Sequence, residues 1–134
     1  MTRPRLLQEK NVSRTRCIVE VGSSCGHFLQ RFIDYTDELI GIESSGECCD
    51  YVASNYSIKT ICGLFEELDP QELSGKASLV ICSHVIEHSC SPRDFIQCLW
   101  ELLSWNGYLY LEVPSTETLA LVRLPGFRIY FSGT

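Results

Sequence analysis

The sequence predicts an α/β domain with a mostly parallel sheet that is covered by helices on both faces. Two observations lead to this fold class. Short, almost continuously apolar runs recur along the chain, and segments with helical spacing of apolar residues separate them. The chain has 134 residues, which is enough for one domain with one hydrophobic core.

The first unit predicted is a strand, a glycine-bearing loop and a helix. Residues 17–21, CIVEV, form a run rich in β-branched side chains that stops at Gly22. The loop SSCG follows. Apolar residues then recur at helical spacing, at Phe28, Leu29, Phe32 and Ile33. A glycine loop is therefore expected between a strand and the start of a helix.

The same alternation continues to the end of the apolar part of the chain. The further strands expected are residues 39–43, 58–62, 77–82 and 108–113. The helices expected between them are residues 46–55, a short helix within residues 65–73 that Pro70 interrupts, and a longer helix after residue 91.

The last helix has the clearest boundaries. Ser91 is expected to cap it, Pro92 suits its first position and Asp94 brings a negative charge to its first turn. Asn106 and Gly107 are expected to end it. Its apolar face consists of Phe95, Ile96, Leu99, Leu102 and Leu103.

Composition excludes some functions and locations. The net charge of −6 opposes a broad electrostatic contact with nucleic acid or an anionic membrane. No apolar run is long enough to span a bilayer, and the first residues contain no apolar signal core. We therefore expect a cytoplasmic protein, in which the eight cysteines are thiols.

A nucleoside ligand is predicted by the loop at residues 22–26 together with Glu43. In a parallel sheet, ligands bind beyond the carboxyl ends of the strands, and a carboxylate at the end of the second strand can accept hydrogen bonds from ribose hydroxyls. Ser24 and His27 stand where a dinucleotide fingerprint needs glycine, and no phosphate-loop lysine follows. A pyrophosphate ligand is therefore not expected.

The segment HVIEH, residues 84–88, matches the H-x-x-E-H pattern of one class of zinc peptidases. That chemistry needs both histidines on one helix face, whereas His84 directly follows a predicted strand. His84, Glu87 and His88 are also a possible zinc or manganese site. A loop that binds no metal is the favoured interpretation.

Four segments in order resemble motifs of class I S-adenosylmethionine-dependent methyltransferases: CIVEVGSSCGHFL, LIGIESS, CGLFEEL and SLVICSHVIEHSCSPRDFIQCLWELLSWNGYLYLEVPS. The resemblance implies a Rossmann-like three-layer sandwich with strand order 3-2-1-4-5-7-6, and S-adenosylmethionine as cofactor. It also implies cofactor contacts at matching positions: Glu20, Gly22, Ser24 and Gly26 for the methionine part, Glu43 for the ribose, Ser44, Leu64, Phe65 and Glu66 for the adenine, and Ser83 and His84 near the sulfonium.

The function expected from the resemblance is methyl transfer to a small-molecule acceptor, with His84 or His88 as a candidate base. A non-catalytic cofactor-binding or protein-interaction module is the alternative. Three parts are expected, namely a tail at 1–16, a core at 17–115 and a partial acceptor-side segment at 116–134. Because the sheet would be incomplete at its C-terminal side, the strand at residues 108–113 would have an unpaired edge, which favours a homodimer or a partner chain.

Overall fold

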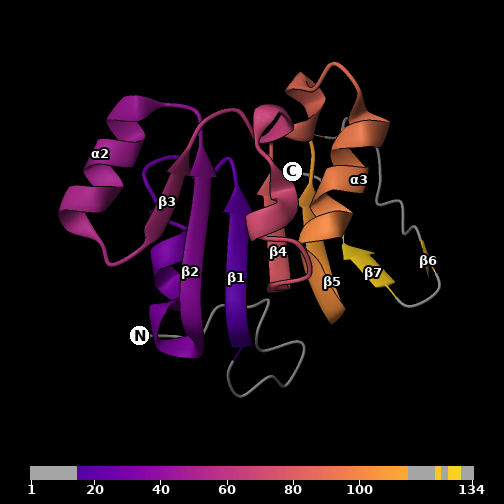
Figure 1. The fold of residues 1–134 in the computed structure, drawn as a ribbon, viewed down its shortest axis with the longest axis horizontal. Helices are drawn as coiled ribbons and strands as arrows, with labels where there is room; N and C mark the ends of the chain where they lie inside the picture. Colours follow the sequence, from indigo (N-terminus) through magenta and orange to yellow (C-terminus); the bar gives the residue numbers. More distant parts are fainter. Residues whose placement is uncertain (1–14, 115–122, 125–126, 131–134) are drawn as a thin grey trace.

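Seven strands form the sheet at the centre of the fold, in the order β3-β2-β1-β4-β5-β7-β6 (Figure 1). The computed structural model describes residues 15–114, 123–124 and 127–130. The strands are β1 (Thr15–Val21), β2 (Thr36–Glu43), β3 (Lys59–Cys62), β4 (Ala77–Ser83), β5 (Leu103–Glu112), β6 (Arg123–Leu124) and β7 (Phe127–Tyr130). All neighbouring pairs are parallel except β6 and β7.

The outer edge of β5 differs from the expectation. Leu109 and Tyr110 pair with Ile129 and Tyr130 of β7, so the prediction of an unpaired edge is wrong over this stretch. The alternation of apolar and polar residues in the last part of the sequence predicts an extended segment there, and β7 confirms it. The strand order agrees with the one that the resemblance implies.

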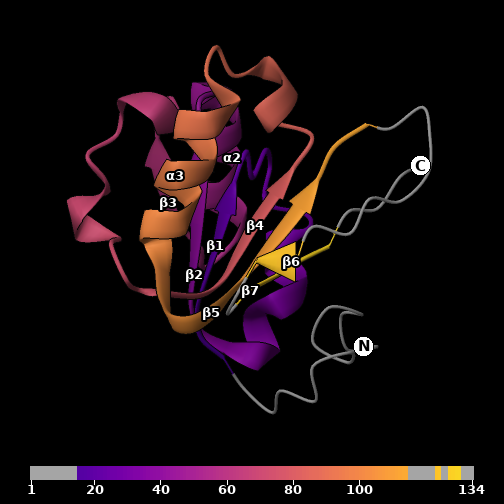
Figure 2. The ribbon, with the colours of Figure 1, turned by 90° about the vertical axis from the view of Figure 1, so that its right-hand side faces the viewer.

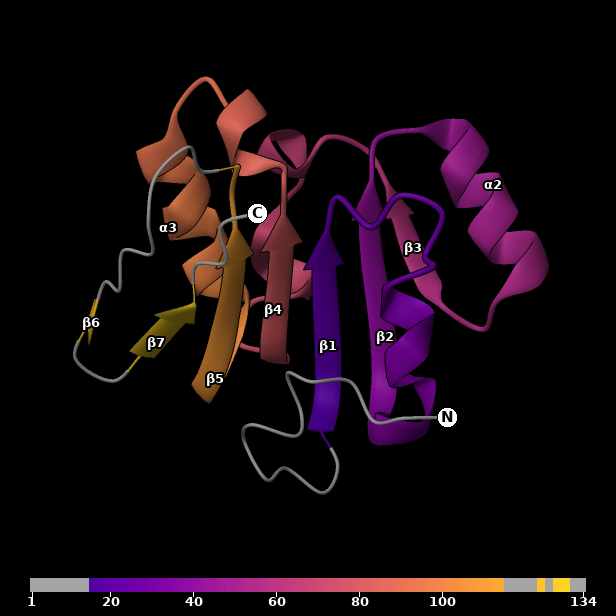
Figure 3. The ribbon, with the colours of Figure 1, turned by 180° about the vertical axis from the view of Figure 1, so that it is seen from behind.

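Two separate hydrophobic clusters fill the two faces of the sheet and confirm the three-layer arrangement. One contains side chains of α3 (Pro92–Leu102), η2 (Phe65–Glu67) and η4 (Ile86–His88). The other contains Leu29 and Phe32 of η1 (Leu29–Tyr35) and Val52 of α2 (Gly46–Asn55). Figure 1 shows α3 in front of the sheet. Figure 3, the view from behind, shows η1 on the opposite face, and Figure 2 shows the sheet from its side with both faces in view.

The helix after the glycine loop is a 3-10 helix rather than the expected α-helix. Its buried side chains are Leu29 and Phe32, whereas Phe28 and Ile33 are exposed. Side chains three residues apart align along a 3-10 helix, so one such pair faces the sheet. The apolar pattern located the helix correctly but did not reveal its winding.

Helix α3 begins at Pro92 as expected, but it ends at Leu102 and β5 starts at once. Pairing of Leu103 with Ala77 of β4 replaces the last helical turn that the sequence predicts. The Ser91 side chain donates a hydrogen bond to the Asp94 carboxylate (2.6 Å) and bonds no backbone N–H of the helix.

Within the described residues, no helix is long and apolar enough to cross a bilayer.

Candidate functional site

A cavity of about 360 Å³ lies at the carboxyl ends of β1, β2, β3 and β4. Its walls come from the loops after these strands, at the upper edge of the sheet in Figure 1. The predicted site residues that line it are Gly22, Glu43, Ser44, Leu64, Phe65, Glu66, Ser83, His84 and His88. The fold thus brings together, around one space, residues that are far apart in the sequence.

Three predicted positions lie outside the cavity wall: Glu20, Ser24 and Gly26. Ser24 is exposed and has a φ of 49°, a left-handed conformation that favours glycine. Gly26 is buried and also left-handed, with a φ of 73°. Because a Cβ there would lie 3.1 Å from the side chain of Val52, Gly26 mainly allows the loop to pack against α2.

Gly22 borders the cavity, but its backbone is partly covered. Its φ is 74°, and its N–H donates to the Ile42 carbonyl over 2.8 Å. A Cβ on this residue would collide with the Val85 side chain, which sits on the α-carbon of the glycine. Gly22 is one of the predicted cofactor contacts, and the structure shows that the Val85 side chain already lies against it.

The Glu43 carboxylate joins the glycine loop to the start of α2. Its Oε2 accepts a hydrogen bond from the Ser24 N–H and its Oε1 accepts one from the Ser45 N–H, both over 2.8 Å. The Ser44 hydroxyl donates a longer bond of 3.4 Å to Oε1. Because a carboxylate has about four acceptor positions, the half-buried side chain can still accept hydrogen bonds from a ligand in the cavity.

Glu20 is a buried acid in the middle of the sheet. Its side chain is 5% exposed and its Oε2 has no hydrogen-bond partner. Burial raises the pKa of the Glu20 carboxyl from the ordinary 4.5 to about 8. An unsatisfied buried carboxyl one residue before the cavity-lining Val21 is suited to a cationic N–H donor.

The His84 and His88 side chains are exposed by comparison, although the backbone of this segment makes several hydrogen bonds. His84 has a φ of 55°, and its backbone N–H donates to the Glu112 carbonyl over 2.9 Å. Its exposed imidazole lies 3.8 Å from the Glu87 carboxylate, measured from Nδ1 to Oε1. His84 precedes the single 3-10 turn of η4, so it does not share a helix face with His88 and the peptidase geometry is not formed. In the described part of the chain, no three His, Cys, Asp or Glu side chains are grouped to hold a metal ion.

Two hydroxyl–carboxylate pairs complete this side of the cavity. Ser83 donates to Glu112 over 2.7 Å, and Ser89 donates to Glu66 over 2.6 Å. Sequence reasoning missed Glu112 and Ser89. Glu112 had a signal, because it is an acid at the carboxyl end of a parallel strand, as Glu43 is. Ser89 had none, since its partner is 23 residues away.

Two apolar residues next to each other in the sequence have different environments. Phe65 is 8% exposed, and its ring packs edge-on against Phe95 with centroids 5.0 Å apart. Leu64 is 50% exposed and lines the same cavity. Leu64 is therefore an exposed apolar side chain that is available to cover a flat ring, while Phe65 supports the floor.

Comparisons with known proteins identify a matching family and similar structures. A sequence profile described as a methyltransferase domain matches residues 2–130. The YcgJ protein of Bacillus subtilis is 18% identical with a TM-score of 0.67, over 82% of this chain and 51% of its own. A putative S-adenosylmethionine-dependent methyltransferase of Methanococcus maripaludis is 12% identical with a TM-score of 0.68, over 81% of this chain and 52% of its own.

A further similar structure is the plantazolicin methyltransferase BpumL, solved in complex with a triazolic desmethylPZN analogue and S-adenosylhomocysteine (SAH). It is 18% identical with a TM-score of 0.60, over 72% of this chain and 38% of its own. At these identities the similarity concerns the fold alone. The chain spans about half the length of the first two structures and 38% of the third. No curated relative matches the chain by sequence.

Proposed function

The chain belongs to the methyltransferase-domain family, and from this premise we propose that it is the cofactor-binding core of a class I S-adenosylmethionine-dependent methyltransferase. Family membership implies S-adenosylmethionine as the cofactor. When bound, it supplies a methyl group on a positively charged sulfur. The observation that carries the proposal is the cavity at the carboxyl ends of β1 to β4, with Glu43 on its wall. The unsatisfied Glu20 carboxyl, one residue before the cavity-lining Val21, supports it.

The residues around the cavity fit the parts of this cofactor. Glu43 would accept hydrogen bonds from the ribose hydroxyls with the acceptor positions that Ser24 and Ser45 leave free. Glu20 would pair with the ammonium group of the methionine part, which would satisfy its Oε2. Leu64 would cover the adenine, with Ser44 and Glu66 at its polar edge.

The chemical step requires mainly alignment, because methyl transfer from a sulfonium is an in-line displacement. An oxygen or carbon acceptor also loses a proton. We assign this proton to His84 or His88, which line the cavity on the β4 side. The Glu87 carboxylate, 3.8 Å from the His84 ring, would stabilise the imidazolium that forms.

The acceptor that we propose is a small molecule. The net charge of −6 disfavours a polyanionic acceptor such as bulk nucleic acid. We also propose a cytoplasmic location, which the eight free cysteines support because thiols persist in a reducing compartment.

Calorimetric titration with SAH tests the cofactor assignment. The wild-type chain should bind SAH, and Glu43→Gln should bind it at least about tenfold more weakly, since a charged hydrogen-bond acceptor is lost. Glu47→Gln is the matched control, because Glu47 is an exposed acid in the first turn of α2 and does not line the cavity. A folded wild-type chain that does not bind SAH would contradict the proposal.

A second experiment separates the enzyme from the non-catalytic module. Methyl-labelled S-adenosylmethionine is incubated with the protein and a cell extract, and the extract is then divided into small-molecule, protein and nucleic-acid fractions. Label in the small-molecule fraction that His84→Ala or His88→Ala reduces by about 100-fold supports the proposed base. Label only in another fraction refutes the acceptor class, and tight SAH binding without any transfer favours the module.

A further inference from the structure

Four cysteines gather beside Glu43, around the first turn of α2, and form two close pairs. The sulfur of Cys25, in the glycine loop, lies 3.0 Å from that of Cys48. The sulfur of Cys49 lies 2.6 Å from that of Cys62, the last residue of β3. Cys48 and Cys49 are consecutive, so the two pairs are side by side, and all four residues are free thiols.

We propose that each pair closes to a disulfide when the protein meets a small-molecule disulfide such as oxidised glutathione, so that the start of α2 is a thiol modification site. The inference is independent of the cofactor, since it concerns only the chain and an oxidant. Disulfides in reducing compartments are usually transient and respond to the redox state, which is the behaviour expected of thiols that are paired but not bonded.

The backbone around both pairs is already held in place. Cys62 pairs with Glu43 in the β2–β3 register, and the Cys49 thiol also donates to the Glu43 carbonyl over 3.5 Å. The loop that carries Cys25 is tied to Glu43 through the Ser24 N–H. A disulfide bond is about 2.05 Å long, so the sulfurs of either pair need to approach by only about 1 Å or less.

The solvent exposure of the two sulfurs determines the order in which Cys62 and Cys49 react. Cys62 is exposed and accepts a hydrogen bond from the buried Cys49 thiol. The Cys62 thiolate attacks one sulfur of the small disulfide and expels one small thiolate. Cys49 then loses its proton to solvent and attacks the Cys62 sulfur, which expels the second small thiolate. The two protein thiols are oxidised by two electrons, and the small disulfide is reduced to two thiols.

Burial and the hydrogen bond to Cys62 raise the pKa of Cys49 to about 12, so Cys49 is a thiol near neutral pH. This agrees with Cys62 as the first nucleophile and Cys49 as the second. The second step should therefore accelerate as the pH rises above neutrality.

The Cys25–Cys48 bond would have a structural consequence. Cys25 follows Ser24, and Cys48 lies three residues after Ser45, so the bond would link the two segments that the Glu43 carboxylate bridges. Oxidation would therefore fix the glycine loop covalently against α2. It would also restrict the unfolded chain, which raises the melting temperature.

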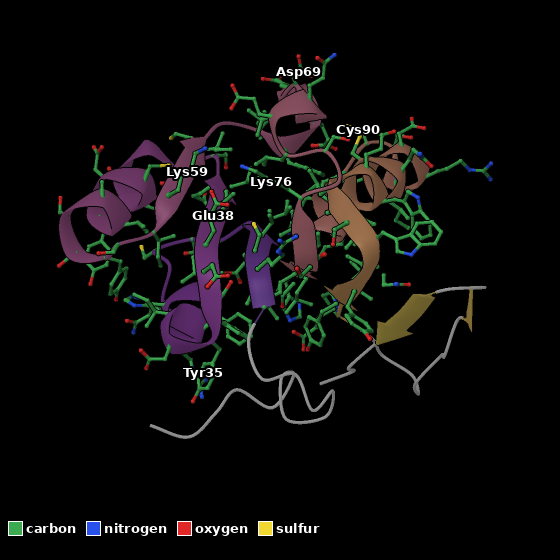
Figure 4. All side chains as sticks on the ribbon, turned by 60° about the horizontal axis from the view of Figure 1, so that its bottom comes forward. Tyr35, Glu38, Lys59, Asp69, Lys76 and Cys90 are labelled. Atoms are coloured by element: carbon green, nitrogen blue, oxygen red, sulfur yellow. The ribbon has the colours of Figure 1, made fainter. Side chains whose placement is uncertain are left out.

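Peptide mapping by mass spectrometry tests the proposal on the full chain. The reduced protein is titrated with oxidised glutathione, digested without reductant and mapped. The expected products are Cys25–Cys48 and Cys49–Cys62 linkages that dithiothreitol reverses. Cys90 is an internal control, because it is exposed and lies by α3, away from α2 (Figure 4), and should carry only glutathione. Stable glutathione adducts on Cys25 or Cys62, or linkages to Cys90, would overturn the proposal.

Two serine variants separate the pairs. Cys48→Ser should lose only the first linkage, and Cys62→Ser only the second. If a variant does not fold, the wild-type chain still decides the question by its melting temperature before and after oxidation. A rise that dithiothreitol reverses supports the two bonds. Both linkages with an unchanged melting temperature would contradict the restraint that we infer.

Discussion

The two sides of the cavity are built differently. On the side of β1 and β2, the Glu43 carboxylate is held by two backbone N–H groups and Gly22 is packed under Val85. On the side of β4, His84 and His88 are exposed. The first side therefore has a fixed geometry that suits recognition of a constant ligand. The second side presents two exposed imidazoles, which suits the proton transfer that we propose.

Gly22→Ala should cause the largest loss of unfolding free energy, so it is the strongest test of the rigid side of the cavity. A left-handed alanine costs about 1–2 kcal/mol, and overpacking against Val85 adds about 1–3 kcal/mol. Urea denaturation measures the loss of unfolding free energy. The matched control is Gly75→Ala, because Gly75 has a φ of 69° and nothing within 4 Å of an added Cβ. Equal losses in the two variants would show that Val85 does not press on Gly22.

The second largest effect should be a pH dependence of the unfolding free energy that is caused by Glu20. Since its pKa is raised to about 8, the folded chain keeps a proton that the unfolded chain releases from about pH 4.5. This contribution is full below the unfolded pKa and is lost as the pH rises through 8. Between pH 5.5 and 8, unfolding free energy should fall by about 2–3 kcal/mol.

Glu20→Gln should flatten this slope, which denaturant titrations at several pH values would measure. A slope that the variant leaves unchanged would mean that Glu20 is not the group that titrates. SAH binding near neutral pH should also release a proton if its ammonium pairs with Glu20, and calorimetry in buffers of different ionisation enthalpy detects this.

Glu43→Gln should have an intermediate effect on stability. The amide still accepts one hydrogen bond, but the second backbone N–H loses its charged acceptor, so we expect a loss of about 1–2 kcal/mol. Ser24 amide exchange, measured by hydrogen–deuterium exchange, should accelerate. Unchanged protection of that amide would indicate that the bond to Oε2 contributes little to holding the loop.

The smallest effects on stability and on SAH affinity should come from His84→Ala and His88→Ala, whose proposed role is in the chemical step. Both side chains are exposed, so unfolding free energy should change by less than about 0.5 kcal/mol and SAH affinity by less than about threefold. Thermal unfolding and calorimetry provide both values. A large loss of stability in either variant would show that this side is as tightly built as the first.

Local sequence patterns were sufficient for several elements. Helix α2 has the predicted bounds, Gly46–Asn55, because Ser45 at its N-cap accepts a hydrogen bond from Cys48 and the next strand begins soon after. Strand β4 begins at the predicted residue and extends one residue further. The positions of the site loops followed from the same reasoning, since parallel strands place their carboxyl ends on one edge of the sheet.

The sequence by itself determined the succession of strands and helices along the chain, because the spacing of apolar residues that distinguishes them is local. Only the tertiary structure decided the contact of Val85 with Gly22, the unsatisfied oxygen of Glu20, and the pairing of Cys25 with Cys48. The last two of these residues are 23 positions apart, and their distance depends on how the glycine loop packs against α2. No local pattern encodes such a distance, because it is set by strand register and by the packing of the layers.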